Sequence, residues 1–368
     1  MVQTGGVLEW VGLFVLERGV VNFMRKKGTS AVVVLIVCMI LAFTGCSNKK
    51  EGTKEINVEQ KKIQIGLSFD SFVIERWQRD REVFVSRAQD LGAEVNVQNA
   101  NGDVKEQISQ IEYLIDKKMK VIVVIPIDAD ACKDVVKKAK DAGIKVVAYD
   151  RLLTNANTDL YISFDNEEVG RMMAETMVNH IPAGGNIVTV FGSPTDHNVQ
   201  MVEQGFEEVI KKSDLNIVYS DYAQGWLAEE AFNAVNQALS ITEDIDGVMC
   251  GNDDLASQAV LALSENRKAG KVIVTGQDAD LVACQRIVEG TQAMTVYKPV
   301  DKLAKSAAEY AVKLAKDEDI NVKSTINDGK YDIPYVKLEP IAVTKDNIDE
   351  VIIEGGFQKK EEVYLNIP

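Results

Sequence analysis

The chain has 368 residues, of which 26% are charged and 46% hydrophobic, a composition that suits a globular protein with two domains. Its formal net charge of −15 repels phosphate backbones, which disfavours nucleic acid as a partner. The five cysteines are scattered, and the two histidines, His180 and His197, belong to no cluster with metal-ligand spacing. We therefore expect neither a disulfide framework nor a metal site, and no cofactor.

An export signal is predicted at residues 1–45. Arg25-Lys26-Lys27 precedes an uninterrupted apolar run at 31–43, which is followed by small residues. A basic segment, a short apolar segment and small residues before a cleavage site make up a signal peptide. The apolar run is too short for a comfortable transmembrane span, although an uncleaved signal anchor is the alternative. Because residues 1–23 lack this charge pattern, we expect translation to start at Met24.

The end of the signal predicts a lipid anchor. Phe43-Thr-Gly-Cys46 resembles the bacterial lipobox, in which the cysteine becomes the lipidated first residue, although Phe43 replaces the usual leucine. Acyl chains on Cys46 would hold the protein stably at a membrane. Residues 46–62 are polar and rich in lysine and glutamate, which suits a flexible tether. We expect an extracytoplasmic protein on the outer face of a one-membrane bacterium, with a periplasm as the alternative.

From Lys61 onward, strand and helix patterns alternate in two rounds. The expected strands are Ile63–Phe69, Glu94–Gln98, Val121–Pro126, Lys145–Asp150 and Tyr161–Phe164, then Asn186–Phe191, Asn216–Tyr219, Gly247–Cys250, Lys271–Thr275 and Ala293–Val296. The expected helices are 75–91, 104–117, 129–142 and 166–179, followed by helices that begin at Asn198, Leu227, Asp254, Asp280 and Lys298. Strands of the first round start about one βαβ unit apart. The pattern predicts an α/β protein with two doubly wound, Rossmann-like parallel-sheet lobes.

Polar clusters follow almost every expected strand, at the edge where open α/β sheets bind ligands. No Gly-x-Gly-x-x-Gly follows the first strand and no Walker-type lysine loop is present, which disfavours a nucleotide. Carboxylate, guanidinium and carboxamide groups match vicinal hydroxyls, and Trp77 and Trp226 could cover the flat faces of a pyranose. Each cluster alone is commonly a loop or helix cap, but their recurrence favours a neutral sugar.

Six strings in these clusters carry a resemblance to a known family. The strings are Glu75-Arg76-Trp77-Gln78, Gln98-Asn-Ala-Asn101-Gly102, Ala148-Tyr-Asp150-Arg151, Tyr161-Ile-Ser-Phe-Asp165-Asn166, Gly276-Gln-Asp278-Ala-Asp280 and Gly290-Thr-Gln-Ala-Met-Thr-Val-Tyr297-Lys298-Pro299. From about 61 to 357 the chain closely resembles the periplasmic D-xylose-binding proteins of ABC transporters, which have the type I periplasmic-binding-protein fold. The resemblance implies that the sugar is contacted by Arg76, Trp77, Asp150, Arg151, Asn198, Trp226, Asn252, Asp278 and Lys298. His197 departs from the family, in which we expect an asparagine at this position.

The resemblance also implies a hinge made of three chain crossings, near Asp165-Asn166, Tyr297-Lys298 and Asp328-Gly329. The first lobe would comprise about 61–165 plus 298–327, the second about 166–297 plus 328–356, and 357–368 would be a tail. A sugar held by both lobes favours a closed form. We expect that form to deliver D-xylose to an ABC permease. A co-receptor for a sensor histidine kinase is the alternative role, and glucose, arabinose or ribose are alternative ligands.

Other functions fit the sequence less well. A repressor of this core fold would need a basic helix-turn-helix where the export signal stands. An enzyme would need a nucleophile or a general base, and the candidate group is Ser193, Asp196 and His197. Neighbours in one loop rarely face each other, so we expect no enzyme. The stretch Thr242–Gly247 lacks the first carboxylate and the distant glutamate of a calcium loop, which favours a solvated turn.

Overall fold

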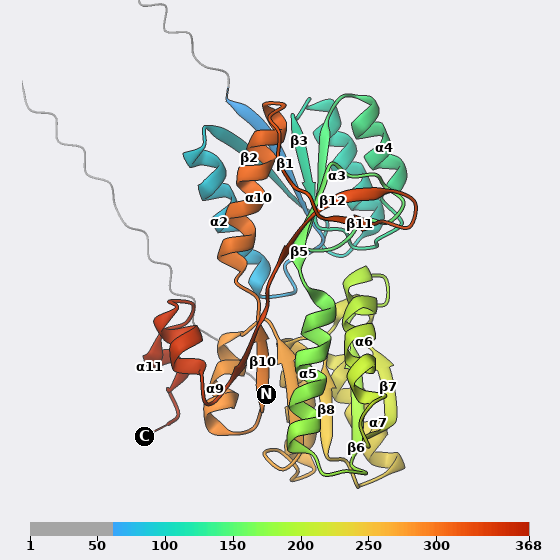
Figure 1. Cartoon of the computed structure of the whole chain (residues 1–368), viewed down its shortest axis with the longest axis vertical. Helices are drawn as coiled ribbons and strands as arrows, with labels where there is room; N and C mark the ends of the chain where they lie inside the picture. The colour runs from blue at the N-terminus through green and yellow to red at the C-terminus, as the bar shows by residue number, and fades with distance from the viewer. Residues whose placement is uncertain (1–61, 368) are drawn as a thin grey trace, which may run out of the picture. The chain divides into compact units, whose positions relative to one another are not determined.

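The computed structural model describes residues 62–367. The expected signal at 1–45, the start at Met24, Cys46 and nearly all of the tether therefore lie outside the described residues. Within the described range the strands form one seven-stranded and one six-stranded sheet, each flanked by helices, and Figure 1 shows the two as separate lobes. No helix in this part of the chain combines the length and apolar character needed to cross a membrane.

The seven-stranded sheet of the first lobe has the order β11-β12-β5-β4-β3-β1-β2. Its strands are β1 (Ile63–Phe69), β2 (Ala93–Asn99), β3 (Val121–Val124), β4 (Lys145–Tyr149), β5 (Leu160–Phe164), β11 (Thr325–Asn327) and β12 (Asp332–Leu338). All pairs are parallel except the β11–β12 hairpin.

Buried β3 explains why helices cover both faces of this sheet. The strand is continuously apolar and fully buried, which is typical of a parallel strand packed on both sides. Val121 and Val123 face the core that includes α2 (Arg76–Asp90) and α10 (Val300–Ala315). Ile122 and Val124 face the core that includes α3 (Val104–Asp116) and α4 (Lys133–Asp141). Figure 1 shows α2 and α10 side by side on one face.

The six-stranded sheet of the second lobe has the order β13-β10-β9-β8-β6-β7. Its strands are β6 (Asn186–Phe191), β7 (Asn216–Tyr222), β8 (Gly247–Cys250), β9 (Ile273–Gln277), β10 (Met294–Tyr297) and β13 (Ile341–Thr344). Its helices are α5 (Asn166–His180), α6 (His197–Ile210), η1 (Gln224–Trp226), α7 (Glu229–Ile241), α8 (Asp253–Glu265), α9 (Leu281–Glu289), η2 (Asp349–Glu354) and α11 (Lys360–Val363). Only β13 runs antiparallel to its neighbour among these described strands. The prediction of two doubly wound, mostly parallel sheets is confirmed.

The third chain crossing lies later than predicted. β12 pairs in parallel with β5, with Tyr335 opposite Tyr161, so it belongs to the first sheet. The chain reaches the second sheet only with β13, which pairs with β10. The crossing therefore falls at Glu339-Pro340, and its prediction at Asp328-Gly329, with 328–356 in the second lobe, was wrong.

The reason is that Asp328 and Gly329 form the turn of the β11–β12 hairpin. The Asp328 carboxylate accepts hydrogen bonds from the Lys330 and Tyr331 N–H groups within the turn and from two N–H groups of the first lobe. Gly329 adopts a φ of 104°, which glycine tolerates. A polar, glycine-containing turn thus resembles a linker in sequence.

Residues after 357 are also built into the fold, since α11 and Tyr364 pack on the second lobe with Ile348 and Ile352.

Candidate functional site

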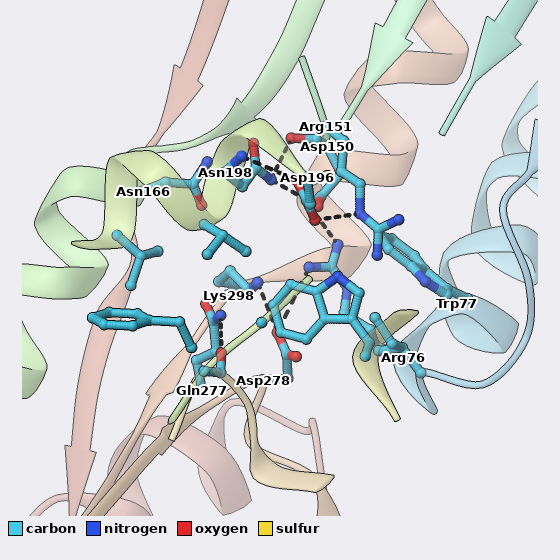
Figure 2. Close-up of a pocket in the computed structure, with 17 residues that line it drawn as sticks. Arg76, Trp77, Asp150, Arg151, Asn166, Asp196, Asn198, Gln277, Asp278 and Lys298 are labelled. Atoms are coloured by element: carbon cyan, nitrogen blue, oxygen red, sulfur yellow. Dashed lines mark hydrogen bonds and ion pairs between the residues drawn. The ribbon is translucent and has the colours of Figure 1, made fainter. Parts of the chain in front are cut away.

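A cavity lies between the lobes at the carboxyl ends of their parallel strands. Its free volume, measured as the space open to the centre of a water-sized sphere, is about 30 Å³. Its lining residues are Ile74, Arg76, Trp77, Asp150, Arg151, Asn166, Phe191, Gly192, Asp196, Asn198, Val199, Val202, Trp226, Gly251, Gln277, Asp278 and Lys298. Figure 2 shows side chains from both lobes converging on this space.

The structure brings together eight of the nine residues that the resemblance named. Asn252 does not line the cavity, although its neighbour Gly251 does. The Asn252 side chain caps α8, because its Oδ1 accepts the Leu255 N–H at 2.9 Å. Its Nδ2 is buried and has no hydrogen-bond partner among the described residues. Asn252 thus stands at the edge of the site and presents one unused donor.

Arg76 lies at the centre of the charged groups. Its guanidinium contacts Asp150 at 2.9 Å and Asp80 at 3.2 Å, and it lies 3.7 Å from Asp278 of the second lobe. Burial disfavours its charge, but Asp150, Asp80 and Asp278 hold the pKa of Arg76 well above its usual value. Burial likewise acts to raise the pKa of Asp150, but Arg76 and Lys298 outweigh it and the net shift is downward. Both groups are therefore charged and mutually neutralised at neutral pH.

Arg151 makes a second buried link. Its Nη1 lies 2.7 Å from Asp70 of the first lobe, and its Nε lies 2.7 Å from Asp196 of the second. Its guanidinium carbon lies 5.5 Å from the Trp77 ring centroid and 5.9 Å from that of Trp226. Burial raises the pKa of Asp196, and Arg151 opposes the rise. The Nη2 of Arg151 has no hydrogen-bond partner in the described part of the chain and can donate to a ligand.

The two tryptophans are placed by different local structures. Trp77 stands in the first turn of α2, whereas Trp226 ends the short helix η1. Space for the Trp226 indole depends on Gly192, since a Cβ there would lie 2.1 Å from the ring atom Cη2. Both indole N–H groups are buried without a hydrogen-bond partner within residues 62–367. The rings therefore present apolar faces together with two unused donors.

Three of the lining residues have left-handed backbones. The φ angles of Asp150, Trp226 and Asp278 are 61°, 60° and 100°. Such values are uncommon outside glycine, especially for a bulky residue, and they concentrate at functional sites. The Asp150 carbonyl is held by hydrogen bonds from Ser163 Oγ at 2.5 Å and from Asn198 Nδ2 at 2.9 Å. Asp278, in turn, lies 2.8 Å from the ammonium group of Lys298.

Sequence reasoning missed several lining residues. Asn166, Asp196 and Gln277 line the cavity but were not among the predicted sugar contacts, although each stands in a polar stretch that the sequence pattern had already singled out. Gln277 donates to the Gly251 carbonyl, and its Oε1 is a buried acceptor with no partner among the described residues. The cavity also has an apolar wall, made of Ile74, Phe191, Val199 and Val202. The sequence does not mark these four as site residues, because apolar residues at such positions are typical of a core.

The Ser193–Asp196–His197 group does not form a catalytic arrangement. His197 is absent from the cavity lining and instead lines an outer groove with Thr195 and Asp128. Burial lowers the pKa of His197. The Ser193 hydroxyl contacts Thr195 at 3.1 Å, and Asp196 pairs with Arg151. Residues 62–367 also contain no group of three or more His, Cys, Asp or Glu side chains arranged to hold a metal ion.

Comparison with known proteins identifies the family. The sequence profile described as "Periplasmic binding protein domain" matches residues 65–319. The chain belongs to the periplasmic binding protein family. As a periplasmic binding protein it is not an enzyme.

Relatives of this periplasmic binding protein include two D-xylose-binding periplasmic proteins. The one from Haemophilus influenzae is 44% identical over 313 residues, which cover 84% of this chain and 94% of the relative. The one from Escherichia coli is 43% identical over 308 residues, which cover 82% and 93%. The predicted resemblance is thereby confirmed. A "Multiple sugar-binding periplasmic receptor ChvE" from Rhizobium radiobacter is 30% identical and covers 81% and 92%.

Solved structures share the fold. An ABC transporter solute-binding protein from Clostridium phytofermentans with bound β-D-glucose has a TM-score of 0.75 at 28% identity, and the match covers 82% of this chain and 99% of that one. A carbohydrate transporter solute-binding protein from Chloroflexus aurantiacus in complex with D-glucose also has a TM-score of 0.75, at 26% identity, with 81% and 98% covered.

Proposed function

We propose that this chain is an extracytoplasmic receptor that binds D-xylose in the interlobe cavity and delivers it to an ABC permease by hinge closure. Two relatives at 43–44% identity carry the name D-xylose-binding periplasmic protein. The observation that carries the proposal is the set of buried hydrogen-bonding groups that remain unused beside neutralised charges. Such groups are costly to bury without a partner, by about 1–3 kcal/mol each, so they indicate a ligand that satisfies them.

The pairing of charges favours a neutral ligand. Arg76 and Lys298 face Asp150 and Asp278 inside the cavity, so an ionic ligand would have to compete with existing ion pairs. The unused groups are both donors and acceptors. They are Arg151 Nη2, Trp77 Nε1, Trp226 Nε1, Asn252 Nδ2 and Gln277 Oε1. A sugar hydroxyl offers one donor and two acceptor lone pairs, so it matches such a mixed set.

The apolar wall favours a pentose. Ile74, Phe191, Val199 and Val202 present no side-chain polar atom to the cavity. D-Glucose carries an exocyclic hydroxymethyl group that D-xylose lacks, and this group would lose hydration against such a wall without gaining a partner. D-Glucose is nevertheless the main competing ligand, because both solved structures described above hold it.

A sugar panel tests the proposal. Thermal shift with equal concentrations of D-xylose, L-arabinose, D-ribose and D-glucose should show the largest stabilisation with D-xylose. A ligand that binds the folded state stabilises it more the further its concentration exceeds its Kd, by about 2.7 kcal/mol at 100 times the Kd. Calorimetry should give D-glucose an affinity at least about tenfold lower than that of D-xylose. Asp278→Ala and Trp226→Ala should bind no detectable D-xylose while they keep the ligand-free melting transition. Tighter binding of D-glucose would replace the proposed sugar, and no response to any sugar would refute the function.

Membrane attachment is a separate part of the proposal. It is supported by the lipobox-like Phe43-Thr-Gly-Cys46 after an apolar run. Full-length protein expressed in a bacterial host should enter the detergent phase of a phase-partitioning assay, whereas Cys46→Ser should remain in the aqueous phase. Equal partitioning of both proteins would contradict lipidation.

A further inference from the structure

The loop between β6 and α6 contains a second contact between the lobes, and this one lies outside the cavity lining. Its residue Thr195 contacts the loop that follows β3 in the first lobe. Thr195 Oγ1 donates a hydrogen bond to the Ile127 carbonyl at 3.1 Å, and the Thr195 carbonyl accepts the Ala129 N–H at 3.0 Å. None of these residues lines the cavity. One residue of the second lobe thus makes two hydrogen bonds to the first lobe without touching the ligand space.

The direction of the donors extends this link toward Trp226. Because a carbonyl can only accept, the single hydroxyl hydrogen of Thr195 is committed to Ile127. Ser193, whose Oγ lies 3.1 Å from Thr195 Oγ1, must then be the donor of that pair. The Ser193 oxygen in turn accepts the Gly225 N–H at 3.3 Å. A continuous hydrogen-bond chain therefore runs from Gly225, which directly precedes Trp226, through two hydroxyls to the first lobe.

The acceptor in the first lobe is held in place by its own lobe. Gln107 is fully buried, and its Oε1 accepts the Ile127 N–H at 3.0 Å. Its Nε2 donates to the Ile125 carbonyl at 2.8 Å. The Thr154 N–H donates to the Ala129 carbonyl at 2.8 Å. These contacts lie within the first lobe, so they can hold the Ile127 carbonyl in position before the lobes meet.

We propose that Thr195 and Ser193 are positioning residues that latch the closed form and fix the turn carrying Trp226 against a bound sugar. The Thr195 contacts to the first lobe exist only when the lobes touch. Breaking them should therefore speed ligand release and leave ligand capture almost unchanged. The latch rests on the proposed function, in that a ligand occupies the cavity and closure retains it.

Stopped-flow binding of D-xylose to the full-length protein tests the latch with matched variants. Thr195→Val removes the hydroxyl but keeps the shape, whereas Thr195→Ser keeps the hydroxyl. Thr195 is solvent-exposed, so water competes for its partners and the effect should be modest. We expect Thr195→Val to raise the dissociation rate about two- to fivefold, with an association rate within twofold of wild type and Thr195→Ser close to wild type.

Two further variants make the test specific. Ser193→Ala should also speed dissociation, and the Thr195→Val/Ser193→Ala double variant should show less than the product of the two effects, because both break one chain. Thr158→Val is the control, since this buried hydroxyl of the first lobe has no hydrogen-bond partner among residues 62–367.

The outcomes separate the latch from the proposed sugar. An unchanged dissociation rate in Thr195→Val overturns the latch. An equal rise of the dissociation rate in Thr195→Ser also overturns it, because the effect would then come from packing and not from the hydroxyl. Multiplicative effects in the double variant also overturn it. If wild type does not bind D-xylose, the proposed ligand fails, and the same kinetics are measured with the sugar that stabilises the protein in the thermal-shift panel.

Discussion

Arg151 Nε lies 2.7 Å from a carboxylate oxygen of Asp196, and this buried ion pair joins the first lobe to the second across the cavity. Removing one partner of a buried pair leaves an uncompensated charge, at a cost of about 3–5 kcal/mol. When the lobes separate, water can solvate that charge. The cost therefore applies to closure more than to folding.

Asp196→Asn should consequently weaken sugar binding at least about tenfold while the ligand-free melting temperature stays near that of wild type. An asparagine retains the oxygen that accepts the Asn198 N–H and caps α6. Calorimetry and thermal melts measure the two effects. Glu309→Gln is the control, because it breaks the half-exposed Arg87–Glu309 pair within the first lobe and should leave affinity unchanged. Wild-type affinity in Asp196→Asn would contradict this account of closure.

Gly192→Ala should displace the Trp226 ring. The added Cβ would lie 2.1–2.4 Å from ring atoms Cη2, Cζ2 and Cζ3, which is closer than packed atoms approach. We expect at least about a tenfold loss of affinity with the folded state retained. Trp226→Phe removes the far edge of the indole, so adding Gly192→Ala to Trp226→Phe should cost much less than adding it to wild type. Calorimetry on the four proteins of this cycle checks the claim, and additive losses would refute it.

Asp254 should make stability depend on pH. Burial, together with the charges of Asp278 and Glu75, raises the pKa of Asp254 from 3.8 to about 6. The folded state therefore binds this proton more tightly than the unfolded state, and the contribution of Asp254 to stability increases as pH falls through 6 toward 4. Relative to wild type, Asp254→Asn should be most stabilised at pH 7.5, and this advantage should shrink as the pH falls.

Thermal melts of both proteins between pH 4.5 and 7.5 provide the measurement. Asp134→Asn, in the first turn of α4, controls for the loss of an acidic residue at a helix N-terminus. A difference between wild type and Asp254→Asn that is constant over this pH range would show that Asp254 is not perturbed as described.

Much of the core fold could be predicted because its signals are local. The continuous apolar run of β3 indicates a strand buried on both faces, and the regular return of such runs indicates parallel pairing through helices. The strands β11, β12 and β13 were not predicted. β12 joins the first sheet by pairing with β5, which lies far away in the sequence, and its residues are partly exposed. The alternation of apolar and polar residues within 332–338 does not show that this strand pairs with β5, so the third crossing was misplaced.

The candidate site divides in the same way. Asp150, Arg151 and Asp278 follow strands whose ends meet at one edge, so their convergence could be predicted. Asn252 follows a strand as well, but it is also the N-cap residue of α8. Its Oδ1 accepts the Leu255 N–H and is therefore not free to bind a ligand. The dependence of Trp226 on Gly192 could not be predicted, because it arises from two loops that meet only in three dimensions.

The left-handed backbones at Asp150, Trp226 and Asp278 limit how the ligand preference can diverge. Aspartate, asparagine and glycine accept this conformation at little cost, whereas β-branched residues resist it. Evolution or engineering toward another sugar is therefore expected to leave these three positions nearly untouched and to proceed through unstrained neighbours such as Val199 and Val202. Those neighbours lie on a regular helix, where an exchange of side chains does not force the main chain to move.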